Sequence, residues 1–347
     1  MVPKTISSHI NVAETEAKRK ACVEAFRWML LARISEEKYA SLYRGGKIFG
    51  GVFIGKGQEA VSASLGVSLR KGDVFAPLIR DQAARLAFGE PLIDATRTYL
   101  GSRLGPMRGR DGNVHRGRPR DGILPMISHL GAMIPAVGGV LFARKLKGET
   151  GSVGATCIGE GGTSTGAFHE GMNFAAVEKL PFVMIVANNQ YAYSTPTSKQ
   201  YACKDLVDKA AGYGIPGYAV DGTRLEACLD VIGHAVELAR NGGGPQLIVA
   251  SILRLAGHGE HDDAHYIDPK LKQSSLGQDC LKLAENFLLE QTWADSSDIE
   301  SWQKEAAQLV EESVATAQRE PAPDPGEEDW CPLATRHLSE GYNSEEE

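Results

Sequence analysis

Long apolar runs and paired cysteines are both missing from this sequence of 347 residues. No apolar stretch reaches the ~20 residues that a membrane-spanning helix needs, so no membrane partner is expected. Residues 1–20 also lack the apolar core of a secretory signal. The six cysteines are widely spread without a Cys-x-x-Cys pair, which argues against a disulfide framework or a cysteine zinc site. These absences predict an enzyme-like chain of the reducing cytoplasm.

An excess of positive charge is missing as well. The chain has 37 Lys and Arg against 44 Asp and Glu, a net charge of -7, so no nucleic acid is expected as a partner. Glycine, in contrast, is abundant: the 39 glycines cluster in loops between apolar runs. This pattern is typical of an α/β enzyme whose backbone approaches a ligand closely.

The first part of the chain is predicted to be helical. Apolar residues recur at three- and four-residue spacing without proline, which predicts an N-terminal helix over about residues 14–44. Shorter helices are predicted over residues 58–69 and 90–102. Residues 101–122 are dense in arginine and glycine and are predicted to form a long loop. A loop of this length inside a compact domain is usually functional.

From Ile134 onward, apolar strands alternate with helices, which predicts a parallel sheet with helices on both faces. The predicted strands are residues 152–158, 182–187, 217–220 and 246–252, and the predicted helices are residues 135–147, 164–179, 206–212 and 224–240. Two C-terminal helices are expected within about residues 270–319, over 271–289 and 299–319. The sequence therefore predicts one α/β domain over residues 1–320, with helical N- and C-terminal extensions, followed by an acidic, proline-rich tail over residues 321–347.

The segment after the first long strand carries the chemistry. The strand ends at Ile158, Gly159-Glu160-Gly161 forms a turn, and a helix is predicted to begin near Ser164. Ligands of open α/β sheets bind at the carboxyl ends of strands, where a helix N-terminus attracts phosphate. The next strand ends in Asn188-Asn189, beside this turn. A carboxylate, an amide oxygen and the carbonyl of Tyr191 would converge there, as hard ligands for Mg²⁺ held by a diphosphate.

Two other kinds of phosphate site also use a glycine-rich turn. A dinucleotide fold would have a similar glycine turn, but it requires an acidic residue near the end of the second strand, where this chain has Asn188 and Asn189. A Walker loop is excluded because no Gly-Lys-Ser/Thr follows. The glycine turn alone is weak evidence, whereas the turn and the asparagine pair together indicate a specific site.

Gly159-Glu160-Gly161 followed by Asn188-Asn189 resembles the thiamine-diphosphate motif. Over roughly residues 25–268 the sequence resembles the α subunits of pyruvate, branched-chain 2-oxo acid and acetoin dehydrogenases. The resemblance implies the thiamine-diphosphate-binding fold, with thiamine diphosphate and Mg²⁺ as cofactors. It is carried by residues 57–60 (GQEA), Arg80-Asp81, 109–115, 127–135, 194–201 (STPTSKQY, most like the branched-chain members) and 210–222.

Carried over by position, the resemblance assigns roles around the cofactor. Mg²⁺ would be bound by Glu160, Asn189 and the carbonyl of Tyr191. Glu160 is one methylene longer than the aspartate commonly found there, as also occurs in branched-chain members. Arg80 would contact the diphosphate. The remaining cofactor-binding residues would be Gly159, Gly161 and Gly162 in the turn, and Ser128 and Leu130 against the aminopyrimidine, with Leu130 as the apolar wedge.

Two histidines are the predicted catalytic residues. His115 lies in the arginine- and glycine-rich loop and His258 follows the strand 246–252. Each matches a histidine that the family places over the reactive carbon, so His258 would also contact the cofactor. A protonated imidazole could stabilise the oxyanion that develops while carbon dioxide leaves. A single loop histidine is usually a solvated surface residue; two at family positions favour catalysis.

Other features of these loops bear on metal binding, control and substrate. His258, His261 and His265 with Asp262 and Asp263 could form a transition-metal site, which is disfavoured because nothing orders them on one helix face. Gly259 stands where mammalian members carry a regulatory phosphoserine, so that control is expected to be absent. Ile79 and the segment 49–53 depart from the family pattern near the acceptor pocket, which leaves the substrate open.

The resemblance also implies partners. The glutamate that activates the thiazolium belongs to a separate β subunit in this family, which implies an α2β2 heterotetramer and the lipoyl domain of an acyltransferase as acceptor. The implied reaction is oxidative decarboxylation of a small-molecule 2-oxo acid, branched-chain-like or pyruvate, with reductive acylation of that domain. Alternatives are an acetoin dehydrogenase-type or other thiamine-diphosphate enzyme that cleaves carbon–carbon bonds, and a nonenzymatic or nicotinamide-binding protein on the same scaffold.

Overall fold

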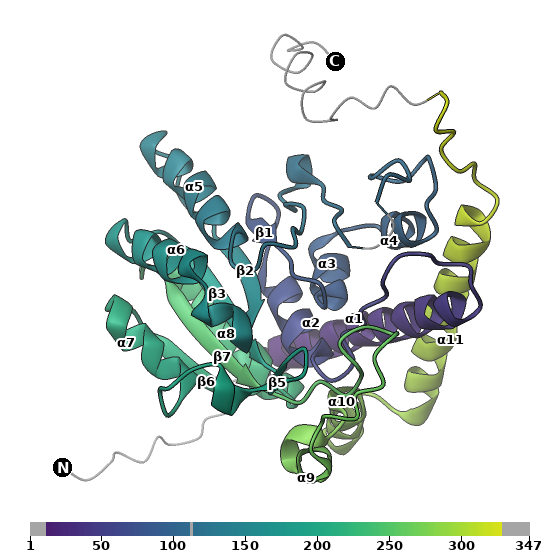
Figure 1. The fold of residues 1–347 in the computed structure, drawn as a ribbon. Helices are drawn as coiled ribbons and strands as arrows, with labels where there is room; N and C mark the ends of the chain where they lie inside the picture. The colour runs from purple at the N-terminus through teal and green to yellow at the C-terminus, as the bar shows by residue number, and fades with distance from the viewer. Residues whose placement is uncertain (1–11, 112–113, 328–347) are drawn as a thin grey trace.

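The computed structural model describes residues 12–111 and 114–327. Five parallel strands form one sheet in the order β1-β2-β3-β7-β6 (Figure 1). The four longer strands confirm the predicted parallel sheet: β2 Gly154–Gly159, β3 Phe182–Asn188, β6 Gly217–Asp221 and β7 Gln246–Ser251. The edge strand β1 Val74–Ala76 was not predicted, because three residues are too few to show a period.

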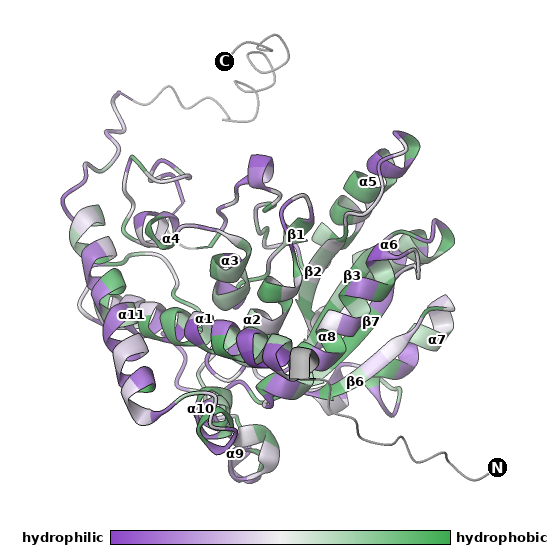
Figure 2. Ribbon diagram, turned by 180° about the vertical axis from the view of Figure 1, so that it is seen from behind, coloured by the Kyte–Doolittle hydropathy of each residue, from purple (hydrophilic) through white to green (hydrophobic). Residues whose placement is uncertain are grey.

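Helices cover both faces of the sheet, as predicted. The helices α2 Glu59–Ser68, α3 Gln82–Phe88 and α8 Leu225–Arg240 pack on one face, and α5 Met133–Leu146, α6 Gly166–Val177 and α7 Lys209–Tyr213 on the other. Alternate residues of β3 point to opposite faces: Val183 and Ile185 join the first core, and Met184 and Val186 the second. The central strands are accordingly hydrophobic along most of their length (Figure 2).

A second helical layer lies outside α2 and α3. The N-terminal helix α1 Val12–Arg44 matches its prediction, and it packs along α2, α3 and α11 Ser296–Ala317. The carboxylate of Asp295 begins α11 by accepting hydrogen bonds from the backbone N–H groups of Ser297 and Asp298. A further short helix, α4 Leu92–Tyr99, matches the prediction over residues 90–102 and packs against α11. No helix of the described residues is long and apolar enough to cross a membrane.

Two helix predictions were wrong in detail, and one helix was missed. The predicted helix 271–289 is two helices, α9 Pro269–Gln273 and α10 Cys280–Glu290, joined by the short 3-10 helix Ser275–Gly277. A new helix begins there because the side chain of Asp279 accepts a hydrogen bond from the backbone of Leu281. The predicted helix 206–212 begins as the 3-10 helix Leu206–Asp208, and α3 was not predicted at all.

Residues 101–111 and 114–122 form the predicted loop, except for the 3-10 helix Pro119–Asp121. The loop is anchored by Arg116, which is buried and donates to the carboxylate of Glu90, with the shortest contact at 2.8 Å, and to Gln82 at 2.7 Å. Arg85 donates to the same carboxylate at 2.9 Å. The domain boundary at residue 320 stays a prediction, and the proposed tail is described only as far as Glu327. The described cysteines are free, as predicted, and Cys331 lies outside the described residues.

Candidate functional site

The carboxyl ends of three neighbouring strands form the base of the candidate site. Gly159 at the end of β2 is in register with Ala187 of β3, and Asn188 of β3 with Ser251 of β7. Glu160 and Asn189, the residues that follow β2 and β3, therefore lie side by side, as the sequence pattern predicted. The α-helix α6 begins at Gly166 rather than near Ser164, because residues Glu160–Ser164 first form a 3-10 turn.

Glu160 is held at this edge by two hydrogen bonds. Its side chain is buried, with 1% of the residue exposed. One carboxylate oxygen accepts from the backbone N–H of Asn189 at 3.1 Å, and the other from the side-chain amide of Gln200 at 3.1 Å. Burial raises the pKa of Glu160, while these two hydrogen bonds act in the opposite direction. A carboxylate has about four acceptor sites, so the group retains capacity for a cation.

The buried side-chain atoms without hydrogen-bond partners in the described part of the chain include one of Asn189 and one of Arg80. The side-chain oxygen of Asn189 accepts no hydrogen bond, although its amide nitrogen donates to Gln58 at 3.5 Å. The Nε of Arg80 likewise has no acceptor. Buried polar atoms are rarely left unsatisfied. A metal ion at the Asn189 oxygen and a phosphate oxygen at Arg80 would satisfy both, so these residues fit a magnesium diphosphate.

The third predicted metal ligand, the carbonyl of Tyr191, accepts a hydrogen bond from Arg254 at 3.2 Å. Arg254 also donates to the carbonyl of Tyr193 at 2.8 Å and lies close enough to Arg80 to influence it. Burial and the charge of Arg254 lower the pKa of Arg80 to about 10, against the opposing charges of Glu36 and Glu160. Two buried guanidinium groups thus face this edge, which favours an anionic ligand there.

The glycines of the turn permit close packing on its two sides. A Cβ atom at Gly161 would lie 2.5 Å from the Cβ of Ala192, and one at Gly162 would lie 2.5 Å from the side chain of Ile158. A larger residue at either position would displace the turn that carries Glu160. A Cβ at Gly159 would meet no atom of the described chain within 4 Å.

His115 and Ser128, both predicted as site residues, contact each other. The Nε2 of His115 lies 2.7 Å from the hydroxyl of Ser128, and its Nδ1 lies 2.7 Å from a carboxylate oxygen of Asp111. The structure thus brings together a predicted pair and adds Asp111, which the sequence did not single out. The only signal was its place four residues before His115 in the same loop.

His258 lies against two aromatic rings. Its ring centre is 4.5 Å from that of Tyr193 and 5.5 Å from that of Phe53. Arg80 donates a hydrogen bond to the His258 carbonyl, which joins this loop to the predicted diphosphate site. Burial, Arg80 and Arg254 lower the pKa of His258 to about 4. Burial, with the two arginines adding to it, thus favours the neutral imidazole near neutral pH.

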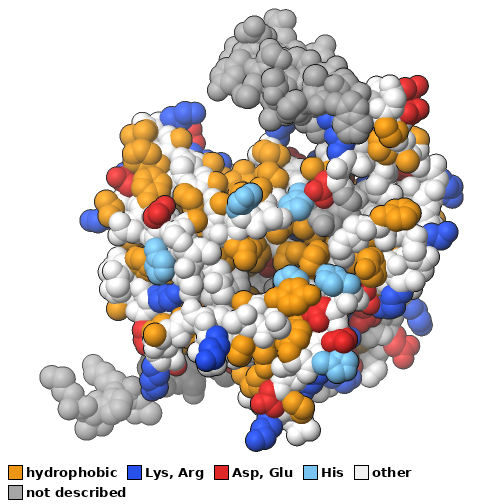
Figure 3. Space-filling view, viewed as in Figure 1, with side chains coloured by type: hydrophobic (Ala, Val, Ile, Leu, Met, Phe, Trp, Pro, Cys, Tyr) orange, Lys and Arg blue, Asp and Glu red, His pale blue; other side chains and the backbone are white. Residues whose placement is uncertain are grey.

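The face above the strand ends is open and partly apolar. Leu130 is 49% exposed and Tyr193 47% exposed, and Phe49 is almost fully exposed. In the space-filling view, histidine and hydrophobic side chains surround a hollow near the middle of this face (Figure 3). Apolar groups of this size next to buried charges indicate a surface that a ligand or a second chain covers.

The alternative metal site in the His258 loop does not form. Asp262 accepts hydrogen bonds from the backbone of His258 at 2.6 Å and of Ala264 at 3.1 Å, and from the hydroxyl of Tyr266. Its carboxylate therefore organises the loop. Within residues 12–111 and 114–327, no three His, Cys, Asp or Glu side chains are grouped so that they could hold a metal ion.

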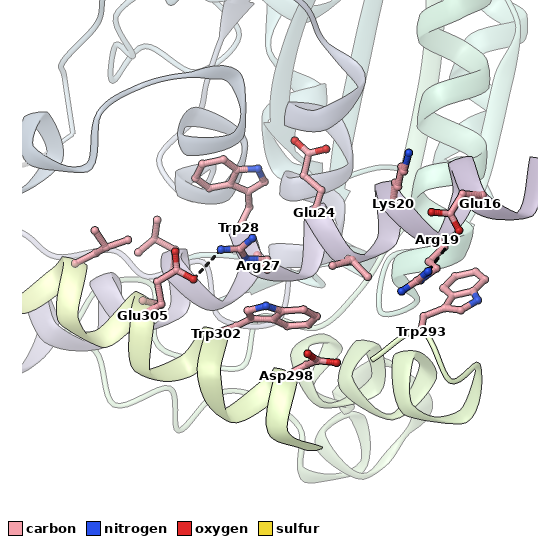
Figure 4. Close-up of a pocket in the computed structure, with 14 residues that line it drawn as sticks. Glu16, Arg19, Lys20, Glu24, Arg27, Trp28, Trp293, Asp298, Trp302 and Glu305 are labelled. Atoms are coloured by element: carbon pink, nitrogen blue, oxygen red, sulfur yellow. Dashed lines mark hydrogen bonds and ion pairs between the residues drawn. The ribbon is translucent and has the colours of Figure 1, made fainter. Parts of the chain in front are cut away.

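A separate groove of about 650 Å³ lies between α1 and α11. Its wall includes Trp28, Trp293 and Trp302, and an ion pair between Arg27 and Glu305 spans it (Figure 4). None of its lining residues belongs to the predicted site. The cavity volume alone would therefore have pointed away from the strand ends.

Comparison with known proteins agrees with the motifs. A family model described as "Dehydrogenase E1 component" matches residues 26–326. The chain belongs to this family. This match confirms the predicted resemblance to 2-oxo acid dehydrogenase α subunits and the predicted fold. The family is thiamine diphosphate-dependent. Glu160, Asn189 and Arg80, to which the resemblance assigns cofactor roles, are buried polar residues close to one another near the strand ends.

Three relatives of this E1 chain differ in the substrates that their names state. The α subunit of acetoin:2,6-dichlorophenolindophenol oxidoreductase from Cupriavidus necator is 32% identical, over 90% of this chain and 93% of the relative. The pyruvate dehydrogenase E1 α subunit from Rhizobium meliloti is 32% identical, over 90% of each chain. The 2-oxoisovalerate dehydrogenase α subunit from Bacillus subtilis is 37% identical, over 70% of this chain and 73% of the relative.

Proposed function

We propose that this chain is the α subunit of a thiamine-diphosphate- and magnesium-dependent 2-oxo acid dehydrogenase. With a β subunit, as an α2β2 heterotetramer, it would decarboxylate a small 2-oxo acid oxidatively and acylate a lipoyl domain. The observation that carries this proposal is the pair of unsatisfied buried atoms, the Asn189 oxygen and the Arg80 Nε, close to Glu160. The free cysteines support a reducing, cytoplasmic location.

In this proposal the strand ends bind the polar end of the cofactor. Glu160, Asn189 and the carbonyl of Tyr191 hold Mg²⁺, and Arg80 contacts the diphosphate. Gly159, Gly161 and Gly162 let the turn approach the diphosphate, and Leu130 supports the cofactor from its apolar side. When bound, thiamine diphosphate supplies a nucleophilic carbon that adds to the 2-oxo group and takes up the electron pair as carbon dioxide leaves.

The two histidines act on the substrate side. The carboxylate of Asp111 can accept a hydrogen bond from the Nδ1–H of His115, an arrangement that directs Nε2 toward the Ser128 hydroxyl. His115 can therefore receive and return a proton at Nε2. His258 is neutral and offers one ring N–H to a developing oxyanion without carrying a full charge. Phe53 and Tyr193 shield His258 from water and give this part of the pocket an apolar wall.

A second candidate is the cleavage of acetoin. It is favoured by the Cupriavidus necator relative, which this chain covers nearly in full. Both reactions need the same metal and diphosphate residues. They differ in what leaves the adduct: carbon dioxide leaves from a 2-oxo acid, whereas a neutral aldehyde leaves from acetoin.

Reconstitution with a β subunit tests the proposal. The purified tetramer is assayed for lipoamide-dependent turnover of pyruvate, 2-oxoisovalerate and acetoin, with thiamine diphosphate and Mg²⁺ at saturation. We expect turnover of one 2-oxo acid by the tetramer and no carbon dioxide release by the isolated α chain. Turnover by the pure chain would place the activating glutamate inside it and contradict the two-subunit proposal. If NAD raises the melting temperature and thiamine diphosphate with Mg²⁺ does not, thiamine diphosphate is excluded as the cofactor.

A further inference from the structure

Gln200 connects a loop to the turn that carries Glu160. It follows the short 3-10 helix Thr197–Lys199. Its side-chain amide nitrogen donates to Glu160 at 3.1 Å and to the carbonyl of Thr195 at 2.8 Å. The hydroxyl of Ser164, at the end of the turn, donates to the backbone carbonyl of Gln200 at 2.8 Å. Side chain and backbone of Gln200 are therefore both tied to the same turn.

The orientation of this amide leaves one of its atoms unsatisfied. The side-chain oxygen of Gln200 is buried and accepts no hydrogen bond from the described residues. The opposite orientation would place that oxygen against the carboxylate of Glu160 and against the Thr195 carbonyl, so that like partial charges would meet. In the structure the amide nitrogen of Gln200 donates to Glu160, and the amide oxygen of Gln200 is left without a hydrogen-bond donor. The contact with Glu160 is thus the one that determines the position of this amide.

Glu160 needs such a restraint because it is a glutamate. Its side chain has one more rotatable bond than the aspartate common at this position, so its carboxylate has more orientations to lose on binding a metal. The backbone N–H of Asn189 fixes one oxygen, and Gln200 fixes the other. With both hydrogen bonds, the plane of the carboxylate is set before any ligand arrives.

We propose that Gln200 is a positioning residue for the cofactor's metal ion, holding the Glu160 carboxylate in the orientation that favours Mg²⁺ over larger cations. This inference rests on the proposed function. Mg²⁺ requires near-octahedral geometry at about 2.0–2.1 Å, whereas Ca²⁺ accepts one or both carboxylate oxygens at about 2.3–2.6 Å. A carboxylate with a fixed orientation therefore favours Mg²⁺. A carboxylate that can rotate binds Ca²⁺ as readily, so the preference for Mg²⁺ is lost.

The test measures metal binding by the reconstituted α and β subunits. Mg²⁺ and Ca²⁺ are titrated calorimetrically in the presence of saturating thiamine diphosphate. Gln200→Met keeps the length of the side chain and removes both donors. We expect its Mg²⁺ affinity to fall about tenfold, the scale for residues that orient a metal ligand. Its Ca²⁺ affinity should change less than about threefold, because Ca²⁺ tolerates a rotated carboxylate.

Two further variants make the result specific. Gln200→Glu places an acceptor where the donor was and should lose more Mg²⁺ affinity than Gln200→Met. Gln246→Met is the matched control, because the side-chain amide of Gln246, like that of Gln200, donates to two oxygen atoms. Its acceptors are the carbonyls of Gly243 at 3.1 Å and Gly244 at 3.0 Å, and Gln246 lies at the amino end of β7. The control should lower the melting temperature and leave both metal affinities unchanged.

The outcomes separate this inference from the proposed function. An unchanged ratio of Mg²⁺ to Ca²⁺ affinity in Gln200→Met overturns the role of Gln200, provided that the wild-type protein binds Mg²⁺. Equal losses for both ions, matched by Gln246→Met, would make Gln200 a structural residue only. If Gln200→Met does not assemble, Gln200→Asn serves instead, because it keeps the amide but withdraws it from Glu160. A wild-type protein without Mg²⁺ binding would refute the proposed function itself.

Discussion

The strand ends and the two histidine loops belong to one candidate site, but the chain fixes their side chains in different ways. Glu160 and Asn189 are buried and directly follow strands that are in register. His115 and His258 lie in loops, are only partly buried, and are held by neighbouring side chains such as Asp111 and Tyr193. The residues proposed to bind the metal therefore come from one chain, whereas the histidines lie beside an open, partly apolar surface that the proposed β subunit would close.

The largest effect, on cofactor binding, is expected from the buried residues Glu160 and Asn189 at the strand ends. Glu160→Ala and Asn189→Ala should each abolish magnesium-dependent binding of thiamine diphosphate while the fold is retained, because water alone does not replace a ligand in a preformed oxygen site. Calorimetry measures the affinity and circular dichroism checks the fold. Glu290→Ala, on an exposed glutamate of α10, is the control. Wild-type affinity in either site variant would remove that residue from the metal site.

A smaller effect on binding and a clear effect on turnover are expected in the loop half. His258→Ala should leave the cofactor affinity within about tenfold and lower turnover of the reconstituted complex about 10²-fold, as expected for one acid–base or oxyanion group. His234→Ala, on an exposed histidine of α8, should change neither quantity. If the His258 variant turns over at the wild-type rate, the histidine is structural and the two halves do not divide binding from chemistry.

A substitution of Asp111 tests whether its carboxylate orients the imidazole of His115 for turnover. Asp111→Asn keeps the size of the side chain but weakens the hold on Nδ1. We expect kcat to fall about tenfold with KM nearly unchanged, the lower scale for the loss of an orienting partner. A shift of the pH profile of kcat together with this loss would separate orientation from general destabilisation. A fall in KM or cofactor affinity alone would contradict this role.

The smallest expected effect concerns stability in acid. The pKa of His258 is about 4 in the fold, below its ordinary value of 6.5, so the unfolded chain binds more protons between these values. This group therefore makes the fold less stable as the pH falls from about 6.5 to about 4. His258→Gln should lose less stability than the wild-type protein between pH 7.5 and pH 5 in urea denaturation. Equal losses would show that the imidazole is not held neutral.

The sequence predicted the buried half better than the loops for a physical reason. β2, the turn and β3 appear as apolar runs that end in glycine or asparagine, so Glu160 and Asn189 could be placed from strand geometry alone. Gln200 and Arg254 could not, because their contacts depend on how loops fold over the strand ends. The lowered pKa of His258 likewise comes from its burial and from Arg80, which is 178 positions away, so no local sequence pattern could indicate it.

Errors in the helices have a similar origin. Residues 271–289 carry apolar side chains at helical spacing on both sides of the break, so the period suggested one helix. The break comes from a capping aspartate, Asp279, whose effect depends on where the following helix packs. Local propensity is outweighed there by tertiary structure.

The buried charge cluster around Arg116 has a consequence for how this protein can diverge. Arg116 directly follows His115, and its guanidinium is matched to Glu90 and Gln82 inside the domain. A buried charge that loses its partner is strongly unfavourable. Arg116 therefore fixes the position of this part of the loop against the domain. This contact holds His115 in place, so Arg116 and Glu90 must be inherited together if the reaction is to stay unchanged.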